Sequence, residues 1–187
     1  MLILLLAVLF PLPVSATIIV NGTFETGDLT GWTQTGETFA TAACLAGTDF
    51  YGRPCTAHSG QFALAYGPPN PGAFFQVLTT QPGHTYRLDF YLRNDNYGQG
   101  AANSLSVLWD GVTVLALAND PDHDYQEFFI GGLLATTAAT TLQFDVVNVP
   151  GAFFIDDLDV LPNPEPGSWL LLASGIVLIA TRFIKLN

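Results

Sequence analysis

The chain has 187 residues, the length of one ordinary domain. Acidic residues outnumber basic ones by 16 to 5, which excludes a nucleic-acid binder, because such proteins use Lys and Arg to neutralise phosphates. Hydrophobic residues make up 49% of the chain, enough to fill a core, so an intrinsically disordered protein is excluded as well. The positive mean hydropathy of +0.37 indicates apolar segments in addition to a water-soluble domain.

The first of these segments lies at the N-terminus. Residues 2–16 carry no charge and end in Val14-Ser15-Ala16. An apolar stretch followed by a small-x-small sequence is typical of a signal-peptidase site. We therefore predict a secretory signal peptide over residues 1–16 and a mature domain that starts at Thr17.

Two cysteines enclose a short loop that contains Gly and Pro. In an exported protein, Cys44 and Cys55 are most simply a disulfide, and their spacing is not that of a CxxC metal site. Phe50 and Tyr51 in this loop, together with Tyr97 farther along the chain, are candidate contacts for a sugar ligand. The alternative for each of them is packing in the core, which is the commoner fate of an aromatic side chain.

The rest of the domain has the pattern of a β protein, with short runs of β-forming residues separated by Gly, Pro, Asn and Asp. Residues 86–92 alternate apolar and polar, and Asp110-Gly111 predicts a hairpin turn between two such runs. Further strands are predicted at residues 74–78, 105–109, 112–115, 125–130, 141–147 and 152–160. Eight to ten strands at this spacing predict an all-β fold, a jelly-roll β-sandwich over residues 17–161.

Catalytic motifs are not recognisable in this pattern. Asp89 and Asp95 are the nearest candidates for the paired carboxylates of a glycoside hydrolase, and no nucleophile motif accompanies them. Residues 119–124, with the sequence NDPDHD, form the densest charged cluster. We interpret this cluster as a solvated loop before a strand, with a second cation site as the alternative. The domain is expected not to be an enzyme.

Three segments spread over the domain resemble segments of a known protein family. The opening segment reads NGTFETGDLTGW (residues 21–32), the middle one HSGQFAL (58–64) and the closing one FIDDLDV (154–160). Together they resemble calcium-containing jelly-roll carbohydrate-binding modules and their galactose-binding-like relatives. The resemblance implies the β-sandwich fold and a structural calcium ion as cofactor.

The same resemblance implies the calcium ligands, namely the carbonyl of Thr23 and the carboxylates of Glu25 and Asp156. Calcium takes six to eight oxygens, and backbone carbonyls can supply the rest. Strand alternation places Asp156 on the face of Phe154 and Leu158, so we expect it to point into the core. The alternative is a metal-free arrangement in which Glu25 caps a turn and Asp156 accepts backbone N–H bonds.

Residues 162–187 form a second segment with the pattern of a targeting signal. A Pro-rich linker with Pro164, Glu165 and Pro166 precedes an uncharged stretch, which predicts a transmembrane helix at about residues 167–184, and the chain closes on a short basic end. This three-part order resembles the PEP-CTERM sorting signal of Gram-negative bacteria. The resemblance implies an exosortase as partner, a membrane cysteine protease thought to cleave and transfer exported proteins.

These predictions describe an exported, exosortase-sorted protein, anchored in the membrane before processing and located in the cell envelope or extracellular matrix afterwards. Its domain is expected to be a non-enzymatic binding or structural β-sandwich associated with an exopolysaccharide matrix. The alternatives are a dedicated, lectin-like carbohydrate-binding module and, less favoured, a glycan-active enzyme. Polysaccharide, exosortase and membrane are the predicted partners, and nucleic acid is not.

Overall fold

The computed structural model describes residues 16–96 and 102–163. The predicted signal peptide up to residue 15, Tyr97, the sorting motif Pro164-Glu165-Pro166 and the predicted transmembrane helix lie outside the described residues. Across the two described ranges, no helix has the length and apolarity needed to cross a membrane.

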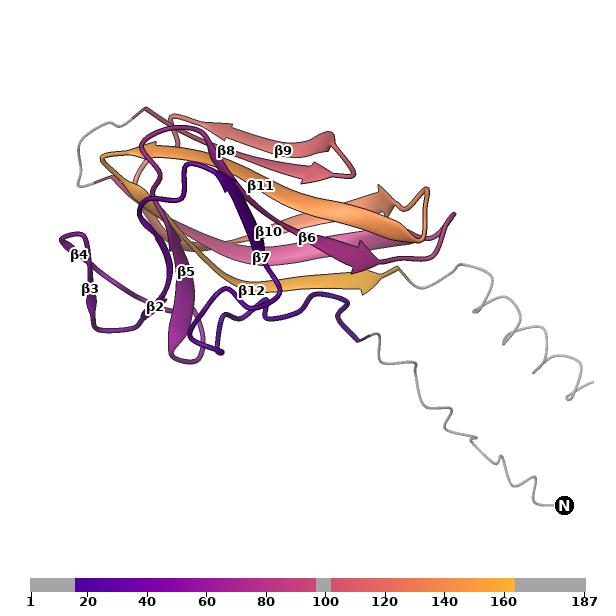
Figure 1. Cartoon of the computed structure of the whole chain (residues 1–187), viewed down its shortest axis with the longest axis horizontal. Coiled ribbons are helices and arrows are strands. Elements are labelled where there is room, and N and C mark those ends of the chain that lie inside the picture. The colour runs from indigo at the N-terminus through magenta and orange to yellow at the C-terminus, as the bar shows by residue number, and fades with distance from the viewer. Residues whose placement is uncertain (1–15, 97–101, 164–187) are drawn as a thin grey trace, which may run out of the picture.

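Two antiparallel five-stranded sheets lie face to face (Figure 1). Sheet A has the order β1-β6-β11-β8-β9 and contains β1 (Thr33–Gly36), β6 (Gly72–Thr79), β11 (Ala139–Val149), β8 (Ala102–Trp109) and β9 (Val112–Ala118). Sheet B has the order β10-β7-β12-β5-β2 and contains β10 (His123–Leu134), β7 (Thr85–Asp95), β12 (Ala152–Pro162), β5 (Phe62–Tyr66) and β2 (Thr41–Leu45). A short hairpin joins β3 (Asp49–Phe50) to β4 (Arg53–Pro54). The predicted all-β sandwich is confirmed.

The core between the sheets follows from the alternation of side chains along each strand. In β7, Leu88, Phe90 and Leu92 are fully buried, whereas the residues between them are partly exposed. The Phe90 ring meets the ring of Phe144 from β11 edge-on, at 5.6 Å between centroids. Phe144 in turn stacks on Phe74 of β6 at 4.8 Å. Aromatic side chains from both sheets therefore hold the two layers together.

The predicted hairpin turn is also confirmed. Asp110 and Gly111 join β8 to β9, and they have positive φ angles of 51° and 80°. A two-residue type I′ turn needs positive φ at both positions, and Asp-Gly supplies it at low cost. The turn matches the right-handed twist of the strands that it connects.

A bulge in β12 overturns one prediction. Asp156 pairs with Tyr91 and Asp159 with Asp89, so β12 advances by three residues where β7 advances by two. Asp157 occupies the bulge with a left-handed φ of 50°. Asp156 therefore lies on the outer face of sheet B, opposite the side predicted by simple alternation, because the extra residue shifts the side-chain order by one.

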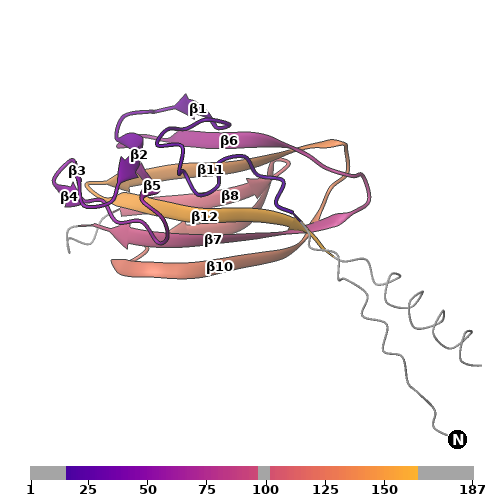
Figure 2. The same ribbon diagram turned by 90° about the horizontal axis from the view of Figure 1, so that it is seen from below.

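A second, smaller core covers one end of this outer face. Cys44 and Cys55 form the predicted disulfide, and residues 44–56, here called the cap, fold over sheet B. Within the cap, Phe50 contacts the ring of Phe154 at 6.4 Å between centroids. Phe154 is therefore fully buried although it points away from the main core. Figure 2 shows the β3–β4 hairpin at the end of the domain opposite the C-terminal end of β12.

Candidate functional site

Asp156 is a fully buried carboxylate that anchors the turn before β5. Its Oδ2 accepts hydrogen bonds from the backbone N–H groups of His58 and Ser59 at 2.8 and 3.2 Å. Its Oδ1 accepts the N–H of Asp157 at 2.7 Å. Burial raises the pKa of the Asp156 carboxyl to about 6, and the three N–H donors oppose this shift because they favour the ionised form.

Glu25 holds the other end of the same turn. Its Oε1 accepts the backbone N–H groups of Gln61 and Phe62, both at 2.8 Å. Gly60 precedes them with a φ of 61°, and a Cβ at this position would collide with the Glu25 carboxylate. The opening, middle and closing segments of the resemblance therefore meet at one turn, which we call the clamp.

The clamp contains the residue types that calcium prefers. Thr23, the third predicted ligand, lies in a turn next to β12, where the N–H of Leu158 donates to the carbonyl of Gly22 at 2.9 Å. The described part of the chain brings no three His, Cys, Asp or Glu side chains together around a metal position. Glu25 and Asp156 fit calcium in donor type, and their observed hydrogen bonds are those of the metal-free alternative. Calcium binding therefore stays a prediction.

An aromatic cluster covers the clamp on the outer face of sheet B. The His58 ring stacks on Tyr91 at 3.5 Å between centroids with a 12° angle, and Tyr125 meets it at 5.4 Å. Asp157 binds His58 Nδ1 through Oδ2 and accepts the Ser59 hydroxyl at Oδ1, both at 2.7 Å. Because Ser59 donates to Asp157 and not to His58, this trio lacks the nucleophile–base bond of a catalytic triad.

The two carboxylates considered for hydrolysis do not form a catalytic pair. Asp89 and Asp95 lie on one strand, β7, about 20 Å apart at about 3.3 Å per residue. Glycosidase carboxylates are roughly 5–10 Å apart. Each of the two pairs instead with an arginine on its own strand, Arg87 at 3.2 Å and Arg93 at 3.0 Å.

A polar hollow lies beyond the clamp, where β7 ends and β10 begins. Its volume is about 290 Å³, and it is lined by Arg93, Asn94, Asp95, Asp122, His123 and Asp124. Arg93 forms ion pairs with Asp95 at 3.0 Å and with Asp124 at 3.8 Å. The sequence did not predict Arg93 and Asn94 as site residues, because no local motif marks them. The pairing of β7 with β10 brings them to the 119–124 cluster.

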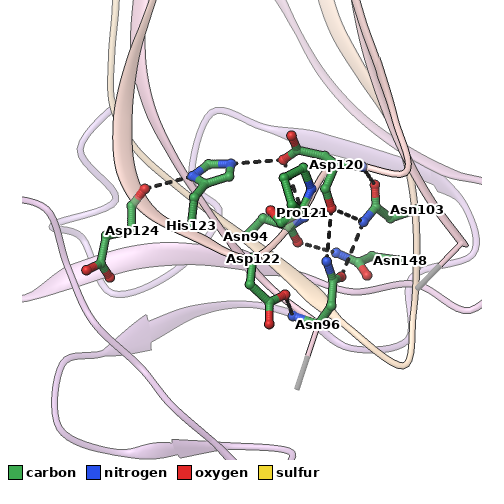
Figure 3. Close-up of polar contacts among 9 residues, drawn as sticks. All are labelled: Asn94, Asn96, Asn103, Asp120, Pro121, Asp122, His123, Asp124 and Asn148. Atoms are coloured by element: carbon green, nitrogen blue, oxygen red, sulfur yellow. Dashed lines mark hydrogen bonds and ion pairs between the residues drawn. The ribbon is translucent and has the colours of Figure 1, made fainter. Parts of the chain in front are cut away.

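The loop at residues 119–124 is more ordered than the predicted solvated loop. The backbone carbonyl of Asp120 accepts hydrogen bonds from the side-chain amides of Asn94, Asn96 and Asn103, at 2.7, 3.0 and 2.8 Å (Figure 3). The Asp120 carboxylate binds His123 Nε2 at 2.9 Å. Asn94 is the one of these amides that lines the hollow, and the network fixes the loop that carries Asp122, His123 and Asp124.

The aromatic residues of the cap have different surroundings. Phe50 is only 7% exposed and belongs to the small core, so its ring is not available to a ligand. Tyr51 is 57% exposed, and its ring lies 5.1 Å from that of Phe39, which is 56% exposed. Phe39 had no sequence signal, because only the folding of the cap brings it to Tyr51.

Comparison with known proteins identifies similar solved structures. No family model matches the chain, and no curated protein matches it. The carbohydrate-binding module TmCBM61, solved with β-1,4-galactotriose, is 20% identical, with a TM-score of 0.59 over 80% of this chain and 100% of that one. The CBM22-1 xylan-binding domain of Xyn10C from Paenibacillus barcinonensis is 15% identical, with a TM-score of 0.54 over 80% of this chain and 97% of that one.

An enzyme is also among the similar structures. The enzymatically active domain of tailspike protein 4 from bacteriophage CBA120 is 12% identical, with a TM-score of 0.56, over 79% of this chain and 21% of that one. At such low identities these likenesses establish the fold, and residue roles do not transfer. The chain therefore shares its β-sandwich with carbohydrate-binding modules.

Proposed function

We propose that this protein is a non-enzymatic carbohydrate-binding protein whose polar hollow holds one part of a polysaccharide. The observation that carries the proposal is the lining of the hollow by a guanidinium, an imidazole and carboxylates. Sugar hydroxyls both donate and accept hydrogen bonds, and such groups can satisfy both roles at once. The volume lies just below the roughly 300–1,000 Å³ of small-molecule sites, which suits a short stretch of a glycan. The shared fold of carbohydrate-binding modules supports the same class of ligand.

Substituting Asp124 by Asn tests this site. The Asp124 side chain is fully exposed at the rim of the hollow, so its substitution should leave the melting temperature unchanged. We expect about tenfold weaker binding, because one charge-assisted hydrogen bond contributes roughly 1.5 kcal/mol. Affinity electrophoresis of the full chain in mild detergent, with galactan, xylan, cellulose and a uronate polymer, measures this.

Asp110→Asn is the matched control, because Asp110 lies in the β8–β9 turn and Asn tolerates its positive φ. The control should bind as the parent does. Failure of the parent to bind any polysaccharide in the panel would overturn the proposed function. If Asp124→Asn binds as tightly as the parent, the hollow is not the glycan-binding site.

We also propose the export and sorting of the protein, supported by the sequence patterns at its two ends. In this proposal an exosortase recognises Pro164-Glu165-Pro166, and the processed domain enters an exopolysaccharide matrix. Replacing the three motif residues by Ala should leave a larger form in the membrane fraction, detected by immunoblotting of fractionated cells. Identical processing of this variant and the parent would contradict sorting without affecting glycan binding.

Calcium at the clamp is a further proposal, supported by the chemistry of Glu25 and Asp156. Among the described residues, Asp156 forms no ion pair with a basic side chain, and Asp157 lies next to it. A divalent cation would neutralise this buried negative charge and tie the three segments together. Its role would be structural.

A further inference from the structure

Phe39, which precedes β2, and Tyr51 of the cap form a small aromatic wedge at the surface. Their rings come from separate segments and meet at 5.1 Å with an angle of 52°. More than half of each side chain is exposed.

The position of Tyr51 breaks a local rule. Tyr51 and Gly52 form the two-residue turn between β3 and β4, with φ angles of 50° and 82°. This turn type favours Asn or Asp at its first position, and a bulky residue with positive φ is an outlier there. Strained residues of this kind concentrate at functional sites. The Tyr51 ring meets the Phe50 ring edge-on at 5.0 Å, and the Tyr51 residue is still 57% exposed, so a ligand can reach it.

The cap holds Tyr51, one of the two residues of the wedge, in a fixed position. The Cys44–Cys55 disulfide closes its base, and Phe50, the neighbour of Tyr51, is buried against Phe154. The Asp49 carboxylate accepts the N–H of Gly52 at 2.9 Å and so fastens the turn itself. A ligand that meets this wedge therefore orders few groups, which limits the entropy cost of binding.

The cap also contacts the wall of the polar hollow. Arg53 Nε donates to the backbone carbonyl of Asp95, and Arg93 Nη1 donates to that of Pro54, both at 3.4 Å. Asp95 and Arg93 line the hollow, and Arg53 is two residues from Tyr51 in the chain. The cap that carries Tyr51 therefore contacts two of the residues that line the hollow.

The size of the wedge indicates its occupant. Two aromatic side chains at these exposures offer roughly 200 Å² of apolar surface, since each has about 150–250 Å² in total. A stable protein partner needs about 800 Å² per side, which is far more. Next to Phe39, the Glu37 carboxylate accepts the Phe39 N–H at 2.9 Å and an Asn70 amide proton at 3.3 Å. A small apolar patch with polar groups at its edge is complementary to a pyranose, because a pyranose ring has apolar faces and hydroxyl groups around its rim.

We propose that the Phe39–Tyr51 wedge is a stacking subsite for a sugar unit of the same glycan chain that occupies the hollow. This inference rests on the proposed function and adds to it a dependence on ligand length. A short oligosaccharide fills the hollow alone. A longer one also reaches the wedge and binds more tightly.

Tyr51→Asn is the decisive variant, because Asn suits the turn better than Tyr does and the fold should keep its full stability. Titration calorimetry of the full chain with β-1,4-linked galacto- and xylo-oligosaccharides of two and six units measures both lengths. We expect about tenfold weaker binding of the six-unit ligand and less than about a twofold change for the two-unit ligand. Phe39→Ala should show the same length dependence. Tyr51→Trp keeps an aromatic ring at this position and should bind the six-unit ligand as tightly as the parent does.

Phe129→Asn is the matched control, since Phe129 is an exposed aromatic on β10 outside the wedge. It should bind both ligands as the parent does. The inference is overturned if Tyr51→Asn binds the six-unit ligand like the parent, or if it weakens both lengths equally. Failure of the parent to bind either length, together with failure to bind any polysaccharide of the panel above, would instead overturn the proposed function. Loss of the wedge alone, no role of the wedge, loss of binding at both lengths and no glycan binding at all therefore give four different results.

Discussion

Replacing Asp156 by Ala is expected to destabilise the domain by about 4 kcal/mol. The change leaves the buried N–H groups of His58, Ser59 and Asp157 without their acceptor. Each unsatisfied donor costs about 1–3 kcal/mol, and removing a buried carboxylate offsets part of the sum. Thermal unfolding followed by circular dichroism should show a midpoint lowered by about 12 °C. An unchanged midpoint would mean that the clamp does not stabilise the fold.

Asp156→Asn is the conservative comparison, because its amide keeps one acceptor oxygen, and its cost should be about half. The folded state binds the Asp156 proton more tightly than the unfolded chain, since burial raises the pKa from 3.8 to about 6. The contribution of this group to stability therefore decreases as the pH rises from about 4 to about 6 and is constant above that range. This part of the pH dependence should be absent from Asp156→Asn.

The same melting experiment examines the calcium proposal. A bound cation would lower the pKa of Asp156 and stabilise the folded state by mass action. EDTA should then lower the midpoint of the parent, and Asp156→Ala should no longer respond to calcium. A parent midpoint that is the same with EDTA and with calcium would contradict the proposal.

Removing the disulfide by Cys44→Ser with Cys55→Ser is expected to cost about 3 kcal/mol, because a short cross-link restricts the unfolded chain. Urea unfolding of the oxidised parent and of the double variant measures this difference. The cap should lose more local stability than the sandwich does, since the small core around Phe50 and Phe154 depends on residues 44–56. Hydrogen exchange should therefore increase in the cap and stay low at Leu88 and Phe90 of β7. Equal exchange in both places would contradict a cap that the disulfide holds.

Sequence periodicity was a good guide where a strand is regular. The alternation along β7 and the Asp110-Gly111 turn predicted both the strand faces and the hairpin, because the physics there is local. The same reasoning gave the wrong face for Asp156. A single residue, Asp157, adopts a left-handed φ and adds a bulge, and nothing in the local sequence distinguishes it from the aspartate before it.

The candidate site was less predictable than the fold. The clamp could be anticipated from its three segments, and its backbone N–H bonds are those of the metal-free alternative, although the particular donors could not be named from the sequence. The hollow joins Arg93 on β7 to His123 on β10, and the wedge joins Phe39 to Tyr51 across the cap. These contacts arise from strand order and from a disulfide-closed loop, and neither can be deduced from spacing along the chain.

The direction of β7 has a consequence for any use of this protein at a surface. The strand starts at Thr85, whose carbonyl accepts the N–H of Asn163 at 2.9 Å, and it ends at Asp95 in the wall of the hollow. Its eleven residues span about 33 Å. Ile18 also pairs with Val160 near Asn163, so both ends of the described part of the chain lie at the pole opposite the hollow and the cap (Figure 1). An attachment at residue 163 would therefore leave the hollow and the wedge unobstructed, with the domain as a spacer of fixed length.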